Sequence, residues 1–192
     1  MQNIFVTIIV LAVLMIVDYV LILNGYALYK RTHAKFVDDA ESPDVNPLFK
    51  KHLDQKKYNL SHFLSIVVVA IVLYSVHYLT TNNLYYFNPW AYPFFSGLLL
   101  SRFIYANARH LQNLVVYYAL HKDVSLLSGK IKQKKLYSLY VSSAHALGVI
   151  FIMLFVLFFT PSWFNLGFAL GPLPIISKNI VWMKKYTKHS KK

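Results

Sequence analysis

Long apolar runs are the feature of this sequence that most restricts its fold. A helix needs about 20 consecutive apolar residues to cross a bilayer, because the hydrocarbon core is about 30 Å thick and each helical residue adds about 1.5 Å. Several runs here reach that length, which ordinary soluble domains rarely show. The sequence therefore predicts an all-α integral membrane protein, a bundle of five transmembrane helices over residues 4–28, 60–79, 90–120, 136–159 and 163–183.

The composition supports a membrane location and excludes other classes of protein. Apolar residues make up 57% of the 192 residues and charged residues 14%, against about 45–50% and about 25% in soluble domains. The net charge of +13 does not indicate nucleic-acid binding, because the basic residues lie between apolar runs. The absence of cysteine excludes disulfides and thiolate chemistry. We expect a single polytopic domain over residues 1–192, in contact with the lipid bilayer and with no nucleic acid.

The distribution of basic residues predicts an orientation. Of the twenty Lys and Arg, seven lie in 30–57, five in 122–135 and six in 178–192, and the connections after the second and fourth runs have none. Basic residues are typical of the cytoplasmic side of membrane proteins. Five crossings bring all three clusters to that side. The sequence thus predicts a multi-pass protein of a cell membrane, with its N-terminus outside, its C-terminus in the cytoplasm and a cytoplasmic loop over 29–59.

The sequence does not decide whether the fifth run forms one continuous helix. Gly171, Pro172 and Pro174 interrupt it, so the helix either breaks at Gly171–Pro174 or continues as one crossing. A break would free carbonyl groups that line a cavity, as in transporters. Gly167 and Gly171 are four residues apart, a spacing that lets two helices approach closely. We favour helix packing as the role of these two glycines.

Three ionisable residues are predicted to lie at one depth in the membrane. Asp18, Arg109 and His145 are each 10 to 13 positions from the nearest basic residue at the inner end of their run, which places them roughly 15–20 Å from that end. A charge buried in lipid costs about 2.5–3.5 kcal/mol or more unless it is paired. We therefore predict a structural ion pair between Asp18 and Arg109, with Arg102 as the alternative partner.

A polar stripe on the third run predicts a ligand-binding site. Arg102, Ala106, Arg109 and Asn113 follow one another at spacings of four, three and four, so they share one helix face. Two arginines then face one membrane-embedded carboxylate, which leaves a guanidinium group for an anion. The candidate ligand-binding residues are Arg102, Arg109, Asn113 and His110.

Signals for catalysis and for metal binding are weak. Ser142 and His145 share a helix face and are candidates for a nucleophile and a base, and Asp18 is a candidate base. Small-residue packing explains Ser142 equally well, and no spacing typical of a metal site occurs in the predicted helices. The acidic segment 38–46 has the oxygen ligands of a Mg²⁺ or Ca²⁺ site, but a solvated loop is the better interpretation. No cofactor is indicated.

Three classes of function remain open. The favoured one is a multi-pass protein with a buried, cytoplasm-facing cavity that carries arginines and binds or conducts an anionic small molecule or ion as a homo-oligomer. The second is a membrane-embedded enzyme acting on a lipid or lipid-linked substrate, with the arginines on a phosphate-bearing head group. The third is a non-catalytic accessory subunit that needs a partner membrane subunit. We prefer the first class, although the small size of the chain and its lack of catalytic motifs support the third.

Overall fold

The structure is a computed structural model that describes residues 3–32, 60–82, 89–123, 125 and 135–189. The elements in these ranges are α1 (Ile4–Arg31), α3 (Leu60–Thr81), α4 (Ala91–Lys122), α5 (Lys135–Phe159), α6 (Trp163–Leu170) and α7 (Leu173–His189). The predicted all-α architecture is confirmed for this part of the chain. Each predicted run coincides with a helix, and the fifth run contains two. The acidic segment 38–46 and most of the predicted loop 29–59 lie outside the described residues.

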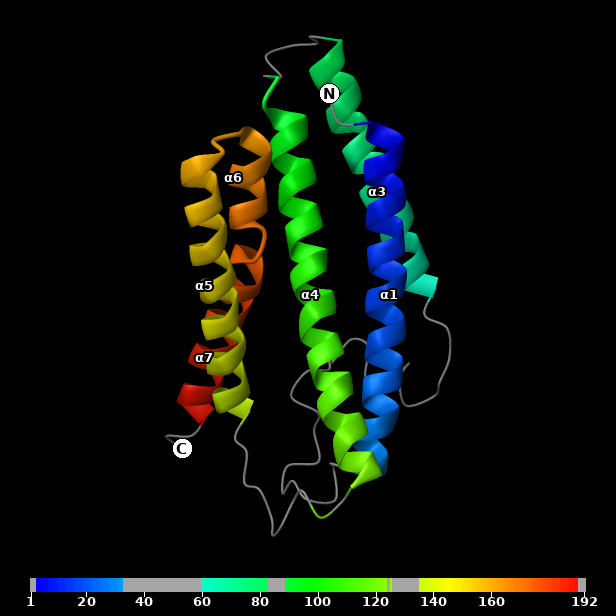
Figure 1. Ribbon diagram of the computed structural model, residues 1–192, viewed down its shortest axis with the longest axis vertical. Coiled ribbons are helices and arrows are strands. Elements are labelled where there is room, and N and C mark those ends of the chain that lie inside the picture. Colours follow the sequence, from blue (N-terminus) through cyan, green and yellow to red (C-terminus); the bar gives the residue numbers. More distant parts are fainter. Residues whose placement is uncertain (1–2, 33–59, 83–88, 124, 126–134, 190–192) are drawn as a thin grey trace.

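Helix α4 lies in the middle of the molecule (Figure 1). It packs against α1 and α3 on one side and against α6 on the other, while α5 packs on α6 and α7. The two chain termini lie toward opposite ends of the bundle (Figure 1). Because α6 and α7 follow one another in the same direction, the helices form five antiparallel segments.

Four helices are long and apolar enough to cross a membrane, which is compatible with a multi-pass membrane protein. Large apolar side chains are exposed along these helices, as expected of surfaces that face lipid. Phe151, Phe155 and Phe158 on α5 are examples, with exposed fractions of 76%, 63% and 80%. The four candidate spans are Ile4–Arg31, His62–Thr81, Leu139–Phe159 and Trp163–Lys184.

The third predicted run, now α4, is not among these four spans. It contains Arg102, Arg109 and His110 together with several amide side chains, which lower its hydropathy. Helix α4 lies between α1 and α6. These neighbouring helices can form hydrogen bonds with its polar side chains, which lipid cannot. Among the described helices, the one that carries Arg102 and Arg109 is therefore also the central one.

Glycines let α4 and α6 cross at close distance. A Cβ atom at Gly97 of α4 would lie 2.9 Å from the backbone nitrogen of Phe168, and one at Gly167 of α6 would lie 2.8 Å from the carbonyl carbon of Phe94. Packed interiors do not yield to such overlaps, so neither position has room for a side chain. Gly171 continues the same contact one turn later. The close approach predicted from the spacing of Gly167 and Gly171 is confirmed.

Two prolines account for the break in the last segment. Helix α6 ends at Leu170 and α7 begins at Leu173, so the interruption falls at Gly171 and Pro172, inside the predicted stretch. A proline has no N–H to donate, and its ring also clashes with the preceding turn of a helix. Pro174 lies in the first turn of α7, where a backbone N–H would have no partner within the helix. After the break the chain packs on α5.

Asn107 links α4 to α1 through a hydrogen bond. Its side-chain amide is buried, and Nδ2 donates to the carbonyl oxygen of Leu14 at 2.9 Å and to that of Phe103 at 2.8 Å. The amide oxygen Oδ1 is buried without a hydrogen-bond partner. The free-energy cost of burying that oxygen without a partner offsets part of the gain from the two hydrogen bonds. The net contribution of Asn107 to the stability of the protein is therefore small.

We expect Asn107→Leu to lower the free energy of unfolding by about 0.6 kcal/mol, the usual contribution of a hydrogen bond between membrane helices. The measurement is the unfolding midpoint of the protein in mixed detergent micelles as the denaturing detergent increases. Gln112→Leu is the matched control, because Gln112 is an exposed amide on the same helix. If the two variants unfold at the same midpoint, the link from Asn107 to Leu14 does not stabilise the bundle.

Candidate anion site between helices α4, α5 and α7

Ser142 of α5 is the centre of a polar network that joins three helices. Arg109 of α4 donates from Nη1 to Oγ of Ser142 at 2.6 Å, and Tyr105 donates from its hydroxyl to the Ser142 carbonyl oxygen at 2.9 Å. Asn179 of α7 donates from Nδ2 to Oγ of Ser142 at 3.1 Å and to Oγ of Ser143 at 3.2 Å. Both serines and Asn179 are buried, and Arg109 is half-buried. The network is thus shielded on most sides.

The local helix geometry explains why these side chains meet. Tyr105 and Arg109 are four residues apart on α4, so both project from one face toward α5. Ser142 and Ser143 are small, which leaves room beside the α5 backbone for the long arginine side chain. Asn179 reaches the same serines because α7 packs on α5.

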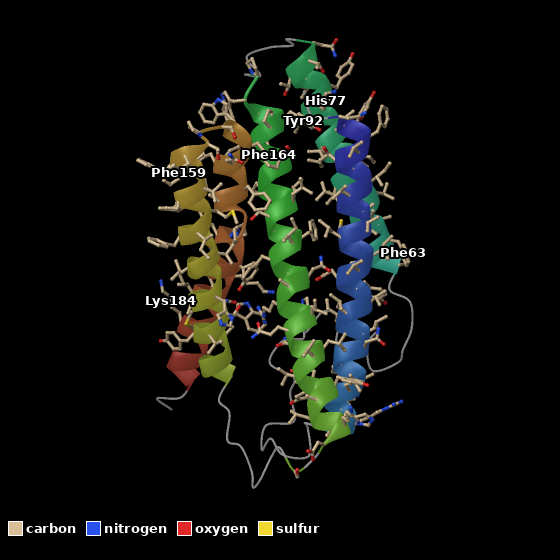
Figure 2. All side chains as sticks on the ribbon, viewed as in Figure 1. Phe63, His77, Tyr92, Phe159, Phe164 and Lys184 are labelled. Carbon is tan, nitrogen blue, oxygen red and sulfur yellow. The ribbon has the colours of Figure 1, made fainter. Side chains whose placement is uncertain are left out.

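Positive charge gathers around this network. The ammonium group of Lys178, next to Asn179 on α7, interacts electrostatically with Arg109 and Arg102. It also lies 6.0 Å from the centre of the Trp182 ring. Side-chain nitrogen atoms collect between α4 and the α5–α7 pair (Figure 2). We call Arg102, Arg109 and Lys178 the cationic cluster.

Acidic residues are scarce in the described helices. Asp18 of α1 is the one acidic residue that they contain. Its Oδ1 atom lies 3.6 Å from Nε2 of His110, and the two side chains are 15% and 18% exposed. His110 is the neighbour of Arg109 in the sequence, but its side chain leaves α4 toward α1. The described part of the molecule therefore has an acidic side at α1 and a cationic side at α5 and α7.

The predicted site residues divide between these two sides. Arg109 and Ser142 meet on the cationic side, and Asp18 and His110 meet on the acidic side. The pairing of Asp18 with Arg109 stays a prediction, while the contact seen for Asp18 is with His110.

The remaining predicted site residues are Arg102 and Asn113 on α4 and His145 on α5. Arg102 is exposed on α4, and Asn113 is half-buried one turn beyond Arg109. His145 is exposed on α5 while Ser142 is buried, and no hydrogen bond joins these two described residues. Among the described residues, no group of three His, Asp or Glu side chains is placed to hold a metal ion.

Sequence reasoning missed three members of this site. Tyr105 was one tyrosine among fifteen, and nothing in its neighbourhood marked it. Lys178 was counted with the basic residues of the C-terminus, although six positions separate it from the next lysine. Asn179 gave a usable signal, because an amide inside a predicted membrane span is expected to bond to a neighbouring helix. Comparison with protein-family models, with curated proteins and with solved structures found no match for this chain.

Proposed function

We propose that this chain is a five-pass membrane protein that binds an oxyanion at the cationic cluster, from the cytoplasmic side of a cell membrane. The observation that carries the proposal is the gathering of Arg102, Arg109 and Lys178 beside the Ser142 network, in helices whose one acidic residue is Asp18. An anion between α4 and α7 would relieve the repulsion among the three cations.

The kinds of donor favour an oxyanion as the ligand. A guanidinium group has a planar set of N–H donors that matches a carboxylate, sulfate or phosphate group. The ammonium of Lys178 adds a compact charge, and Ser142, Ser143 and Asn179 add neutral polar groups in the network that holds Arg109. The anion can be a free ion or the head group of a lipid, and the two sources share this chemistry.

The orientation rests on where charge lies along the bundle. Lys30 and Arg31 close α1, and His121 and Lys122 close α4 at the same end of the molecule. The connection between α5 and α6 lies at the opposite end, next to Trp163, whose ring is 5.4 Å from that of Trp90. A pair of tryptophans is typical of a membrane interface. This arrangement supports a cytoplasmic location for the basic end and an outside location for the N-terminus.

A homo-oligomer is the expected working form if the anion is conducted. Five segments are few for a complete pathway in one chain. The exposed apolar faces of α3 and α5 offer large areas for packing against lipid or against further copies. Conduction is therefore proposed for the assembly, and binding for the single chain.

We expect Arg109→Gln to abolish the stabilisation of the purified protein by sulfate. A ligand at roughly ten times its dissociation constant raises the free energy of unfolding by about 1.4 kcal/mol, and the variant loses this gain with its charge. The measurement is the thermal unfolding midpoint in neutral detergent with and without sodium sulfate at constant ionic strength. Arg109→Lys, which keeps the charge, should retain part of the effect.

Lys184→Gln is the charge-matched control. Lys184 is exposed on α7, on the outer flank of the molecule (Figure 2). Its removal lowers the net charge by one, as Arg109→Gln does, but leaves the cationic cluster intact. If both variants lose the response to sulfate equally, the net charge of +13 attracts the ion and there is no site at Arg109.

Two further measurements distinguish the source of the oxyanion. Nanodiscs of neutral lipid and nanodiscs containing phosphatidylglycerol are compared for their effect on the same unfolding midpoint. Stabilisation by the anionic lipid that is lost in Arg109→Gln, with no response to sulfate, indicates a lipid head group. A response to sulfate in neutral nanodiscs indicates a free ion, and sulfate flux into proteoliposomes then tests conduction.

An accessory subunit is the second candidate, and the contacts of Ser142 favour it. Arg109, Tyr105 and Asn179 all bond to this one residue, as a network that only fastens helices together would. In that case Arg109→Gln lowers the unfolding midpoint without sulfate, and sulfate does not change the midpoint of the unaltered protein. A companion chain that remains bound during gentle purification would further support this function.

A further inference from the structure

Two buried oxygen atoms at the contact between α1 and α4 have no hydrogen-bond partner among the described residues. One is Oδ1 of Asp18 on α1, and the other is Oδ1 of Asn107 on α4. A buried acceptor without a donor is costly, and a charged one is more so, which is why folded proteins keep few of them. One proton between these two oxygen atoms would serve both.

The neighbours of the Asn107 amide determine its orientation. Nδ2 donates to the carbonyl oxygens of Leu14 and Phe103. Both of these neighbours are acceptors, so turning the amide around would place its oxygen against theirs. Oδ1 of Asn107 is therefore the atom that faces away from the two carbonyl groups, and it can only accept a hydrogen bond.

Backbone geometry brings this amide to the level of Asp18. In an α-helix the N–H of Asp18 donates to the carbonyl oxygen of Leu14, four residues earlier. The amide of Asn107 bonds to that same oxygen. Helices α1 and α4 run side by side in the same direction (Figure 1). His110 follows Asn107 by three residues, and its Nε2 lies 3.6 Å from Oδ1 of Asp18. The carboxyl group and the amide thus share one turn of the helix contact.

Three groups that can carry positive charge act on Asp18, but none of them gives Oδ1 a hydrogen bond. His110 of α4 is too far away at 3.6 Å. Nε2 of His62 on α3 lies 2.9 Å from the carbonyl oxygen of Met15 and donates to it. Arg102 of α4 is exposed. Their charges favour a carboxylate, yet the hydrogen bonds that a buried carboxylate needs do not come from these groups.

A buried carboxyl group in such a place becomes neutral by binding a proton. Uptake of one proton from water forms one O–H bond and removes the negative charge, which the membrane interior disfavours. As a carboxylic acid, Asp18 gains a donor that a carboxylate lacks. The amide oxygen of Asn107 is an acceptor of the kind that this donor needs.

We propose that Asp18 and Asn107 form a proton-binding site in the membrane interior, in which Asp18 holds a proton as a carboxylic acid and donates a hydrogen bond to Oδ1 of Asn107. This ligand is additional to the proposed oxyanion. The site uses α1 and α4, whereas the network of Ser142 joins α4, α5 and α7. Either site can therefore exist without the other.

The test is infrared spectroscopy of the full chain in neutral detergent, titrated from about pH 4 to about pH 9, a range that covers exposed and buried carboxyl groups. A carboxylic acid has a C=O stretching band separate from those of carboxylates and backbone amides. Ordinary carboxyl groups have lost their protons at neutral pH. We expect one acid group per chain to keep its band there, and the band to move to lower frequency in D₂O.

Asp18→Asn should remove this band. Asp123→Asn is the matched control, because Asp123 is exposed and hydrogen bonds from the side chain and backbone of Ser125 lower the pKa of its carboxyl group. Asp123 is therefore ionised at neutral pH, and its substitution should leave the band unchanged.

Asn107→Leu tests the acceptor. This variant loses a hydrogen bond that only the protonated form makes, so the pH at which the band disappears should fall by up to about one unit. The band should also move to higher frequency. Gln112→Leu, which removes an exposed amide from the same helix, should change neither property.

Three results would contradict the inference. An unaltered chain without an acid band at neutral pH has an ionised Asp18, which overturns the site without the need for any variant to fold. A band that Asp18→Asn leaves in place belongs to another carboxyl group and also overturns it. If Asn107→Leu changes neither the midpoint nor the frequency, Asn107 is not the acceptor and the proposed pair is wrong.

Discussion

Gly167→Ala is expected to destabilise the protein by about 1–3 kcal/mol, the usual penalty for forcing extra volume into a packed contact. A Cβ at this position would lie 3.1 Å from the backbone nitrogen of Leu98 and closer still to the carbonyl group of Phe94. Both obstacles are backbone atoms, which cannot rotate away as a side chain can. Relief requires α4 and α6 to separate along their whole crossing. The unfolding midpoint in mixed detergent micelles measures the loss.

Gly97→Ala should act in the same way, because Gly97 meets the backbone of α6 at the same crossing. The double variant should lose less stability than the two single losses added together, since one separation of the helices relieves both overlaps. Gly148→Ala is the matched control. A Cβ at Gly148 of α5 meets no atom within 4 Å, so stability should be unchanged or slightly raised. Equal losses for Gly148→Ala and Gly167→Ala would contradict a tight crossing.

Single cysteines should label from opposite sides of the membrane if the proposed orientation holds. The natural chain has no cysteine, so each introduced thiol is the one reactive site in the protein. Pro161→Cys lies in the exposed connection between α5 and α6, and Ser125→Cys follows α4 at the other end of the bundle. In intact cells we expect an impermeant maleimide to label Pro161→Cys almost fully and Ser125→Cys hardly at all.

Membrane permeabilisation supplies the control for this experiment. Ser125→Cys should become labelled once the membrane is opened, which shows that its thiol is reactive and had been shielded. Labelling of both cysteines in intact cells would place both ends of the bundle outside and contradict five crossings. The reverse pattern would invert the proposed orientation and move the cationic cluster away from a cytoplasmic anion.

Local chemistry was enough to predict the helices and to mark Gly171–Pro174 as the place where the last one could break, while the break itself was seen only in the structure. Apolar runs of membrane length become helices because a backbone in lipid must satisfy its own hydrogen bonds, whatever its neighbours are. Pro172 and Pro174 end a helix for an equally local reason, since neither has an N–H to donate. The spacing of Gly167 and Gly171 predicted a close helix contact, but Gly97, its counterpart on α4, was found only in the structure.

Several residues of the site were named from the sequence, and the contacts that the structure shows between them were not. Counting residues along a helix gives the depth of a side chain, and by that measure Asp18 has two neighbouring candidates, Arg109 and His110. These two differ by about 1.5 Å in depth but by about 100° in direction around the helix axis. The rotation of α4 against its neighbours brings His110 to Asp18 and turns Arg109 to Ser142.

The sequence by itself determined the apolar helices, the position at which the last one could break and the end of the bundle at which basic residues collect. Each of these depends on neighbours within a few positions in the chain. The tertiary structure alone decided that α4 is central, that Arg109 and Asn179 meet at Ser142, and that Arg109 and His110 reach different neighbouring helices. Those features depend on how helices rotate and pack against one another, and side-chain volumes at close contacts such as Gly97 and Gly167 set that packing.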